Sequence, residues 1–259
     1  MDKSAIKEFW DRKARNYPNP FEKKTLEWTQ SVLKRVRDQG VTFFGKSVLD
    51  IGCGKGAYTL PISYEASYVL GLDCSSSMLE TLTMEAERRG MKNVDVLHGF
   101  WEDLEPERMN LFKRFDIVMA MMAPCVRNER DILKMEACSK EWLIYLGWEK
   151  RKNELMEKVL AMHGIEWNCR SLAFSLCVIL ERLRRKPHFE FFDRTLTVRM
   201  CMEEALHELC NYIELYGKKP KKDLVEKELK KHIKSGYVEQ KTDAEVALIL
   251  WKVPKEEGL

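Results

Sequence analysis

The stretch Val48-Leu49-Asp50-Ile51-Gly52-Cys53-Gly54-Lys55-Gly56 decides how this chain folds. Its first residues continue a short apolar run that begins at Ser47 and predict a buried strand, and the three glycines predict a sharp turn into a helix. A second apolar run, Tyr68 to Asp73, also ends on a carboxylate, and serines 75–77 offer caps for the next helix. Strand, glycine turn, helix and strand in this order predict a βαβ unit with a parallel sheet.

The rest of the chain continues this alternation. We expect further strands over 94–97, 115–120, 142–146, 189–200 and 245–253, and helices over 4–17, 21–38, 75–90, 154–163, 171–185, 202–216 and 221–234. The predicted fold class is therefore α/β: a doubly wound, Rossmann-like, seven-stranded mixed sheet whose last two strands form an antiparallel hairpin. No linker or repeat divides the chain, so a single domain over 1–259 is expected.

Composition sets limits on partners and location. The 259 residues carry 44 basic and 41 acidic side chains, and a net charge of +3 does not call for a polyanionic partner. No apolar run approaches the roughly 18 residues of a membrane span, and the N-terminus lacks a signal-peptide pattern, so a cytoplasmic protein is expected. The eight cysteines include no C-x-x-C pair, which predicts free thiols and no metal site.

Two carboxylates indicate which ligand the glycine turn takes. In doubly wound sheets ligands bind beyond the carboxyl ends of the strands, where the glycines allow close approach. Asp73 ends the second strand and can accept hydrogen bonds from ribose hydroxyls. Asp50 precedes the first glycine and would repel a phosphate, which disfavours a dinucleotide. The pair suits a ligand that carries a ribose and an ammonium group.

These residues carry a family resemblance. Asp50–Gly56 followed by Gly71–Leu79 resembles motif I and its successor in class I S-adenosylmethionine-dependent methyltransferases, in the small-molecule branch. Phe9–Tyr17 is similar to the opening helix of that branch, and Phe115–Ala120 to its fourth strand. The resemblance covers residues 5–148 and implies S-adenosylmethionine as cofactor and methyl transfer to a small molecule. It further implies helices over 1–40 that cover the cofactor, a cofactor-binding core over 41–148, additional helices and a sixth strand over 150–235 as a substrate cap, and a closing strand over 245–253.

The resemblance also implies individual contacts. Asp50, Gly52, Cys53 and Gly54 would hold the methionine part and Asp73 the ribose. The other expected cofactor residues are Tyr17 over the methionine end, Gly56 and Cys74 in the turns, Met78, Trp101 and Glu102 around the adenine, and Ala120 and Met121 at the sulfonium. Tyr17, Met78 and Trp101 are equally explained as packing residues. The expected substrate pocket consists of Trp10, Met122, Cys125 and Trp148. Phe100 stands where the family often has an acid, which puts the adenine contact in doubt.

Several alternatives stay open. The function could instead be that of a nicotinamide-dependent oxidoreductase, an RNA methyltransferase or a catalytically silent S-adenosylmethionine-binding module. Cys125 follows Pro124, as the nucleophilic thiol does in cytosine-C5 methyltransferases, although the accompanying acid and second cysteine are missing. The lysine-rich segment 217–234 has an amphipathic period that favours a solvated helix over a nucleic-acid groove. His98 and His163 are the bases nearest neutral pH, but no catalytic residue is assigned.

Overall fold

The computed structural model describes residues 2–167 and 172–254, and the chain divides into two compact units. The glycine-turn unit comprises Ala14–Gly147, Leu172–Glu190 and Ala247–Leu259. The helical unit comprises Met1–Lys13, Trp148–Ser171 and Phe191–Val246. Two expectations lie outside the described residues: the free thiol of Cys169 and the start of a helix at Ser171.

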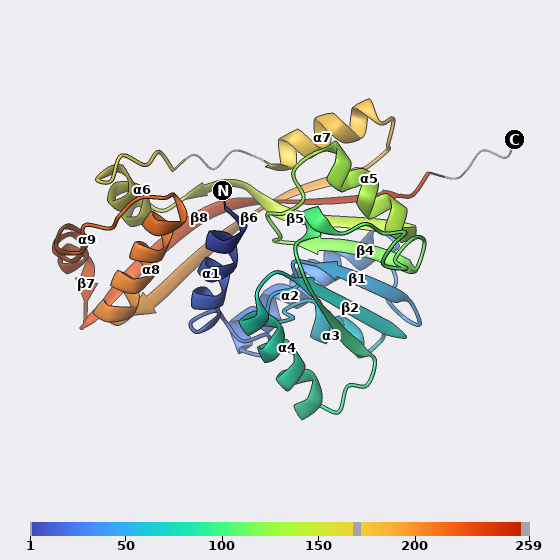
Figure 1. The fold of residues 1–259 in the computed structure, drawn as a ribbon, viewed down its shortest axis with the longest axis horizontal. Coiled ribbons are helices and arrows are strands. Elements are labelled where there is room, and N and C mark those ends of the chain that lie inside the picture. Colours follow the sequence, from blue (N-terminus) through green and yellow to red (C-terminus); the bar gives the residue numbers. More distant parts are fainter. Residues whose placement is uncertain (1, 168–171, 255–259) are drawn as a thin grey trace, which may run out of the picture. The chain divides into compact units, whose positions relative to one another are not determined.

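The described strands form an eight-stranded sheet in the order β3-β2-β1-β4-β5-β8-β6, and the short β7 pairs with β8 off this path (Figure 1). β1 pairs in parallel with β2 and β4, β3 is parallel to β2, and β5 is parallel to β4. The strands are β1 (Ser47–Ile51), β2 (Tyr68–Asp73), β3 (Val94–His98), β4 (Phe115–Met121), β5 (Ser139–Lys152), β6 (His188–Met200), β7 (Ile233–Lys234) and β8 (Tyr237–Lys252).

The last long strand, β8, runs antiparallel to both of its neighbours. Beside β5, the Val253 N–H donates to the Glu141 carbonyl and Lys150 pairs with Glu245, so residue numbers rise along one strand as they fall along the other. The same opposed order relates β8 to β6 through the side-chain pairs Thr195–Asp243 and Arg199–Glu239. The predicted doubly wound mixed sheet with antiparallel C-terminal strands is confirmed, with the two-residue β7 as an addition.

The glycine-turn unit is built on its central parallel strands. Leu49, Ile51, Phe115 and Val118 of β1 and β4 are fully buried, as expected for parallel strands that helices cover on both faces. One set of buried apolar residues from β1, β4 and β5 forms a single core cluster, whereas Cys53 of the glycine turn packs in a separate cluster with residues of α3 and α4. The strand residues of the first cluster are Leu49, Ile51, Phe115, Val118, Ala120, Leu143 and Tyr145. The helices of this unit are α2 (Lys23–Asp38), α3 (Thr59–Ser63), α4 (Ser76–Arg88), α5 (Glu129–Cys138) and α7 (Leu172–Arg182), with the 3-10 turn η1 (Trp101–Asp103).

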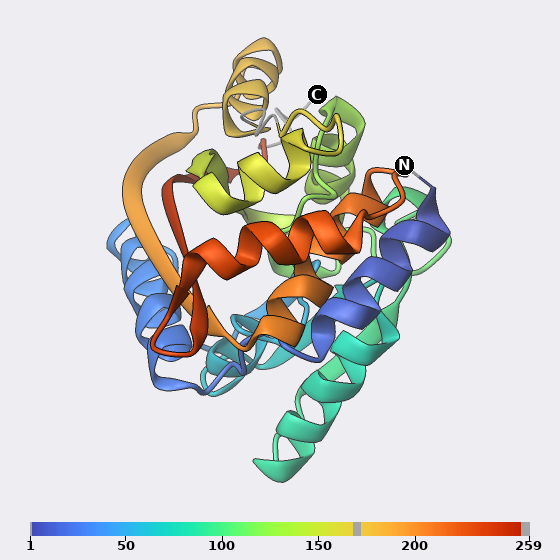
Figure 2. The same ribbon diagram turned by 90° about the vertical axis from the view of Figure 1, so that its left-hand side faces the viewer.

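The helical unit has a separate core. Its helices α6, α8 and α9 pack on one another (Figure 2), and Val159, Leu209 and Val225 are fully buried between them. The ring of Phe9 on α1 meets Tyr212 on α8 edge to face, with centroids 5.1 Å apart. The helices are α1 (Lys3–Ala14, whose last residue belongs to the other unit), α6 (Glu154–Ala161), α8 (Met202–Leu215) and α9 (Lys222–Leu229), followed by the 3-10 turn η2 (Lys230–His232).

Two boundaries in the C-terminal part differ from prediction. The closing strand begins at Tyr237 rather than at 245, because the first half of β8 alternates buried residues with exposed charged ones and therefore has a weak apolar signal. The helix expected to reach residue 234 ends at Leu229. Ser235 and Gly236 both have left-handed φ, of 51° and 82°, which is the geometry of a tight hairpin turn between β7 and β8.

The helix that the glycine turn introduces, α3, has only five residues, too few to produce a periodic pattern. One helix, α5, was not expected from the sequence. α5 buries Asp131, Lys134 and Glu136, which interrupt its apolar stripe. Across residues 2–167 and 172–254, none of the helices combines the length and the apolarity that a membrane crossing requires.

Candidate cofactor-binding site

The three glycines after β1 have left-handed backbones but different surroundings. Their φ angles are +70° at Gly52, +54° at Gly54 and +87° at Gly56. A Cβ on Gly52 would lie 2.6 Å from the Cβ of Ala123, and one on Gly56 would lie 2.9 Å from the Cγ of Leu82. A Cβ on Gly54 would meet only a methionine sulfur, at 4.0 Å. Packing of the protein itself therefore requires two of these glycines, whereas Gly54 leaves room for a ligand to approach the backbone.

Asp73, at the carboxyl end of β2, holds this turn in place. Its Oδ2 accepts a hydrogen bond from the Gly54 N–H at 2.9 Å, and its Oδ1 accepts one from the Ser75 N–H at 2.9 Å. A carboxylate has about four lone-pair sites, so the side chain can still accept a hydrogen bond from a ligand. Burial raises the pKa of Asp73, while the backbone donors at Ser75, Gly54 and Cys74 act in the opposite direction.

Asp50 is a buried carboxylate with one oxygen unsatisfied. Its side chain is 1% exposed, and its Oδ2 accepts a hydrogen bond from the Thr59 hydroxyl at 2.6 Å. No described residue donates to Oδ1. Burial raises the pKa of Asp50 to about 7, with a smaller contribution from the negative charge of Asp73. A buried acceptor without a donor costs free energy, so a cationic hydrogen-bond donor would be well placed here and a phosphate would not.

Three further predicted residues surround the turn. The Lys55 ammonium donates to the backbone carbonyl of Tyr17 at 2.6 Å, which ties the segment after α1 to the glycine turn. The thiol of Cys53 is buried, and burial raises its pKa well above the usual value. The carbonyl of Cys74 is 3.0 Å from Nε2 of His98, so this histidine has a structural partner next to the turn.

The residues predicted to flank an adenine lie in two places. Met78 is on the first turn of α4, 2% exposed, and its N–H donates to the hydroxyl of Ser75, which confirms the predicted serine cap. The Met78 sulfur is the atom next to Gly54. Trp101 is 2% exposed within the core cluster, and no described residue accepts from its indole N–H. Glu102 follows it and is half-buried. Their contact with an adenine stays a prediction.

The end of β4 closes over the same turn. Ala120 and Met121 are buried, and Met122 has a left-handed φ of 61°, so the chain changes direction directly after the strand. This bend places Ala123 against Gly52. Sequence reasoning missed both Ala123 and the hydroxyl partner of Asp50, because neither residue belongs to a short motif. The positive φ that precedes Ala123 has no signal in the sequence either.

Cys125 lies beside this turn as an inactive thiol. Its sulfur would be 3.9 Å from a Cβ on Gly52. Burial, together with the negative charges of Glu102 and Asp73, raises the pKa of Cys125 far above its usual value. A nucleophilic cysteine requires the thiolate, which a cationic neighbourhood stabilises. The surroundings of Cys125 do the opposite, and this weighs against the cytosine-C5 type of chemistry.

The remaining predicted residues belong to the helical unit. Trp10 and Trp148 are both half-buried there, and their role in a substrate pocket stays a prediction. His163 is fixed by two hydrogen bonds, from its Nδ1 to the Val159 carbonyl and from the Lys221 N–H to its Nε2. It is therefore a structural histidine rather than a free base.

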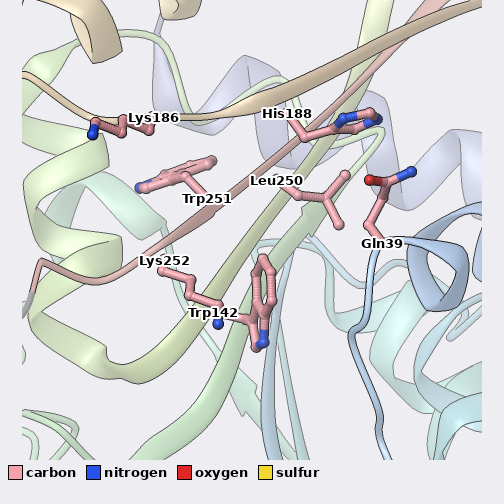
Figure 3. Close-up of a pocket in the computed structure, with 7 residues that line it drawn as sticks. All are labelled: Gln39, Trp142, Lys186, His188, Leu250, Trp251 and Lys252. Atoms are coloured by element: carbon pink, nitrogen blue, oxygen red, sulfur yellow. The ribbon is translucent and has the colours of Figure 1, made fainter.

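A separate pocket of about 390 Å³ lies in the glycine-turn unit, near the amino end of β5 (Figure 3). In Figure 3, Lys252 points toward the ring of Trp142, at 4.7 Å, whereas the amine of Lys186 points away from both. The lysines that line this pocket do not point toward one another, and the pocket is far from the carboxyl ends of the parallel strands. It is therefore distinct from the cofactor cradle. Its lining residues are Gln39, Trp142, Lys186, His188, Leu250, Trp251 and Lys252.

Comparison with known proteins identifies the family. Residues 48–143, which contain the glycine turn, Asp73 and the end of β4, match a family model described as a methyltransferase domain. Residues 48–143 therefore carry a methyltransferase domain of the class I S-adenosylmethionine-dependent kind, and S-adenosylmethionine is the methyl donor of that family. The family assignment replaces the nicotinamide-dependent alternative, in agreement with the unsatisfied carboxylate of Asp50.

Individual relatives agree with this assignment. The chain is 30% identical over 142 residues to a ubiquinone biosynthesis O-methyltransferase from Vibrio atlanticus, covering 54% of this chain and 57% of that protein. The chain thus spans little more than half the length of the curated relatives it matches.

Solved structures show the same fold at low identity. The YcgJ protein from Bacillus subtilis matches 86% of this chain and 97% of its own, with a TM-score of 0.55 and 15% identity. The magnesium protoporphyrin IX methyltransferase from Synechocystis, solved with bound S-adenosylhomocysteine, matches 95% of this chain and 99% of its own, with a TM-score of 0.54 and 14% identity.

Proposed function

We propose that this protein transfers the methyl group of S-adenosylmethionine to a small-molecule acceptor by in-line displacement. One observation carries the proposal. Two carboxylates flank the glycine turn at the carboxyl ends of β1 and β2, and one of them, Asp50, has a buried oxygen that no described residue satisfies. This arrangement suits a ligand with a positive charge and hydroxyl donors and without phosphate.

The chain offers a partner for each part of the donor. Oδ1 of Asp50 would accept from the ammonium group, and the free lone pairs of Asp73 would accept from the ribose hydroxyls. The open space at Gly54 would let the ligand approach the backbone, with Met78 beside the adenine. Tyr17, held by Lys55, would cover the methionine end. These roles agree with the hydrogen bonds of the turn, because Asp73 already fixes Gly54 and so prepares the cradle before a ligand arrives.

This displacement requires few catalytic side chains from the protein. When bound, S-adenosylmethionine supplies a methyl group already activated by a sulfonium. The protein would contribute proximity, orientation and the exclusion of water, which are the main terms in such a displacement. Ala120 and Met121 are buried apolar residues at the end of β4 and would shield the reacting carbon. A base is needed only where the acceptor must lose a proton.

The acceptor class rests on the relatives. Several similar proteins are named for the biosynthesis of quinones or for a magnesium protoporphyrin, which have planar rings, whereas another, from Haemonchus contortus, binds the non-planar phosphomonomethylethanolamine. Within the glycine-turn unit, Met122 and Cys125 follow β4 and would offer apolar, polarisable contacts to a planar acceptor.

Thermal-shift titration with S-adenosylmethionine and S-adenosylhomocysteine tests the cofactor part. At about a hundred times the dissociation constant, either ligand should raise the melting temperature by about 5–10 °C. Asp73→Ala should lose this shift, and Asp95→Ala, on exposed β3, should keep it. If neither ligand shifts the melting temperature of the wild-type protein, the proposal is wrong.

A transfer assay separates the possible acceptors. The protein is incubated with labelled donor and with either small planar acceptors or total RNA, and the labelled acceptor tells the small-molecule function from the RNA function. No transfer to either would favour a silent module.

A further inference from the structure

We propose that the helical unit contains a binding site for a planar small molecule that carries a carboxylate or phosphate, formed by Trp148 and Arg151 of β5, Trp167, and Arg194 of β6. The guanidinium carbon of Arg151 lies 4.5 Å from the ring centroid of Trp167 and 5.8 Å from that of Trp148. Arg194 approaches the same Trp148 ring at 5.7 Å. Two positive charges therefore share one indole.

Arg151 differs from the two other described arginines that have a buried, unsatisfied Nε. Its buried Nε has no acceptor, and within the described part of the chain it forms neither a hydrogen bond nor an ion pair. Arg12 and Arg89 also bury an unsatisfied Nε, but each of their guanidinium groups meets a glutamate, Glu214 and Glu85 respectively. Arg151 is held only by aromatic rings, which stabilise its charge without using its donors. Its planar fork of donors remains available for an anion.

The cluster has the properties of a site rather than of a surface. All four side chains are half-buried, so an anion bound there would be partly desolvated. A guanidinium hydrogen-bonds a carboxylate or phosphate through two parallel N–H donors, and these bonds strengthen as water is removed. The tryptophan faces would stack on the planar body of the same molecule. The favoured ligand is therefore a planar acid, because a neutral planar molecule would leave the charge of Arg151 without a counterion.

This inference concerns the helical unit alone and goes beyond the proposed function. The binding itself needs no methyl donor. It is therefore tested without one, so that a failure of methyl transfer does not affect the outcome. A failure of acid binding likewise leaves the cofactor test intact.

Calorimetric titration of the full chain with 2-naphthoate, 2-naphthyl phosphate and the neutral 2-naphthamide provides the test. At least one of the two acids should bind, and the amide should bind at least tenfold more weakly. The stronger acid tells whether a carboxylate or a phosphate is preferred. If neither acid binds at about 10 mM, or if the amide binds as tightly, the proposal is wrong.

Matched variants locate the site. Arg151→Gln should weaken acid binding about tenfold or more, and Arg151→Lys, which keeps the charge and loses the fork, should fall between. Arg199→Gln removes an arginine of β6 that pairs with Glu239, and it should bind like wild type. Melting temperatures show that each variant is folded, and Arg194→Gln serves as a second test if Arg151→Gln is not. Equal affinity in Arg151→Gln and wild type would overturn the assignment.

Discussion

The glycine-turn unit and the helical unit each contain a charged side chain that has a buried, unsatisfied atom and no ion pair among the described residues, and the two charges are opposite. In the glycine-turn unit it is Asp50, with a second acid, Asp73, contributing to its raised pKa. In the helical unit it is Arg151, and a second base, Arg194, shares its indole. Protein interiors rarely leave such groups unpaired. The difference indicates that one unit is suited to a cation and the other to an anion.

The largest expected effect is the loss of stability when the glycine turn is substituted at Gly52. Gly52→Val would combine a branched side chain at φ +70° with a Cβ 2.6 Å from that of Ala123, and should destabilise the fold by about 3 kcal/mol or more. Gly54→Ala is the control: its Cβ has space, so it should cost only about 1–2 kcal/mol and yet weaken S-adenosylhomocysteine binding. Urea unfolding and ligand titration measure both. Equal stability of the two variants would contradict this account of the turn.

The next effect concerns the acid itself. The pKa of Asp50 is raised to about 7 from 3.8, so the protonated form is favoured in the folded state. The stability that this shift contributes is present below about pH 4 and is lost as the pH rises through 7. S-Adenosylhomocysteine carries an ammonium group and needs the ionised form, so its affinity should fall about tenfold between pH 8 and pH 6.

Asp50→Asn is the control for this pH dependence. It should bind weakly at every pH, and the unliganded variant should lose the dependence of stability between pH 4 and 7. The measurements are calorimetry and thermal melting across that range. An affinity in wild type that does not change from pH 8 to 6 would mean that Asp50 is not the group that meets the ammonium.

A smaller effect on stability is expected at Glu228, a buried acid of the helical unit whose hydrogen bonds are satisfied. Glu228 is 1% exposed beneath Lys158, Lys231 and His232, and their hydrogen bonds lower its pKa to about 2. This contribution to stability is present above pH 4.5 and is lost as the pH falls toward 2. Because the covering cations are partly exposed, Glu228→Gln should cost only about 1–2 kcal/mol. Acid-induced unfolding of the wild-type protein and of Glu228→Gln measures this contribution. Equal stability of the two proteins at low pH would contradict the stabilising role of ionised Glu228.

The smallest effect is expected at Cys125. Burial and neighbouring acids raise its pKa, which disfavours the thiolate that a nucleophile requires. Cys125→Ala should retain methyl transfer within about threefold and cost about 1 kcal/mol of stability. Single-turnover kinetics measure the first and urea unfolding the second. An inactive but folded Cys125→Ala would restore the covalent alternative.

The cofactor side of the comparison was predictable from the sequence, because its determinants are local. Asp50 and Asp73 each end a short apolar strand, and the glycines mark the turn between strand and helix, so a few adjacent residues specify the site. Ser75 as the cap of α4 follows from the same local chemistry. The contact between Gly52 and Ala123 was not predictable, since it depends on the left-handed backbone at Met122.

The arginine and tryptophan cluster of the helical unit could not be predicted from the sequence, for a physical reason. Arg151 and Arg194 lie on different strands. Trp148 is followed by four consecutive charged residues, Glu149 to Lys152, and such a run indicates a solvated loop rather than the continuation of β5. Only pairing in the sheet brings these residues to the same tryptophan. The polar first half of β8 and the buried charges of α5 were obscured in the same way, because tertiary contacts override a weak apolar pattern.

The pair of acids at the glycine turn has a consequence for turnover. In the proposed reaction the ligand enters with a sulfonium and leaves as an uncharged thioether, while Asp50 and Asp73 remain in place. Their negative field attracts the reactant more than the product, so the same event that completes the transfer also loosens the spent molecule. The charge of Asp50 and Asp73 should accordingly weaken product inhibition by S-adenosylhomocysteine.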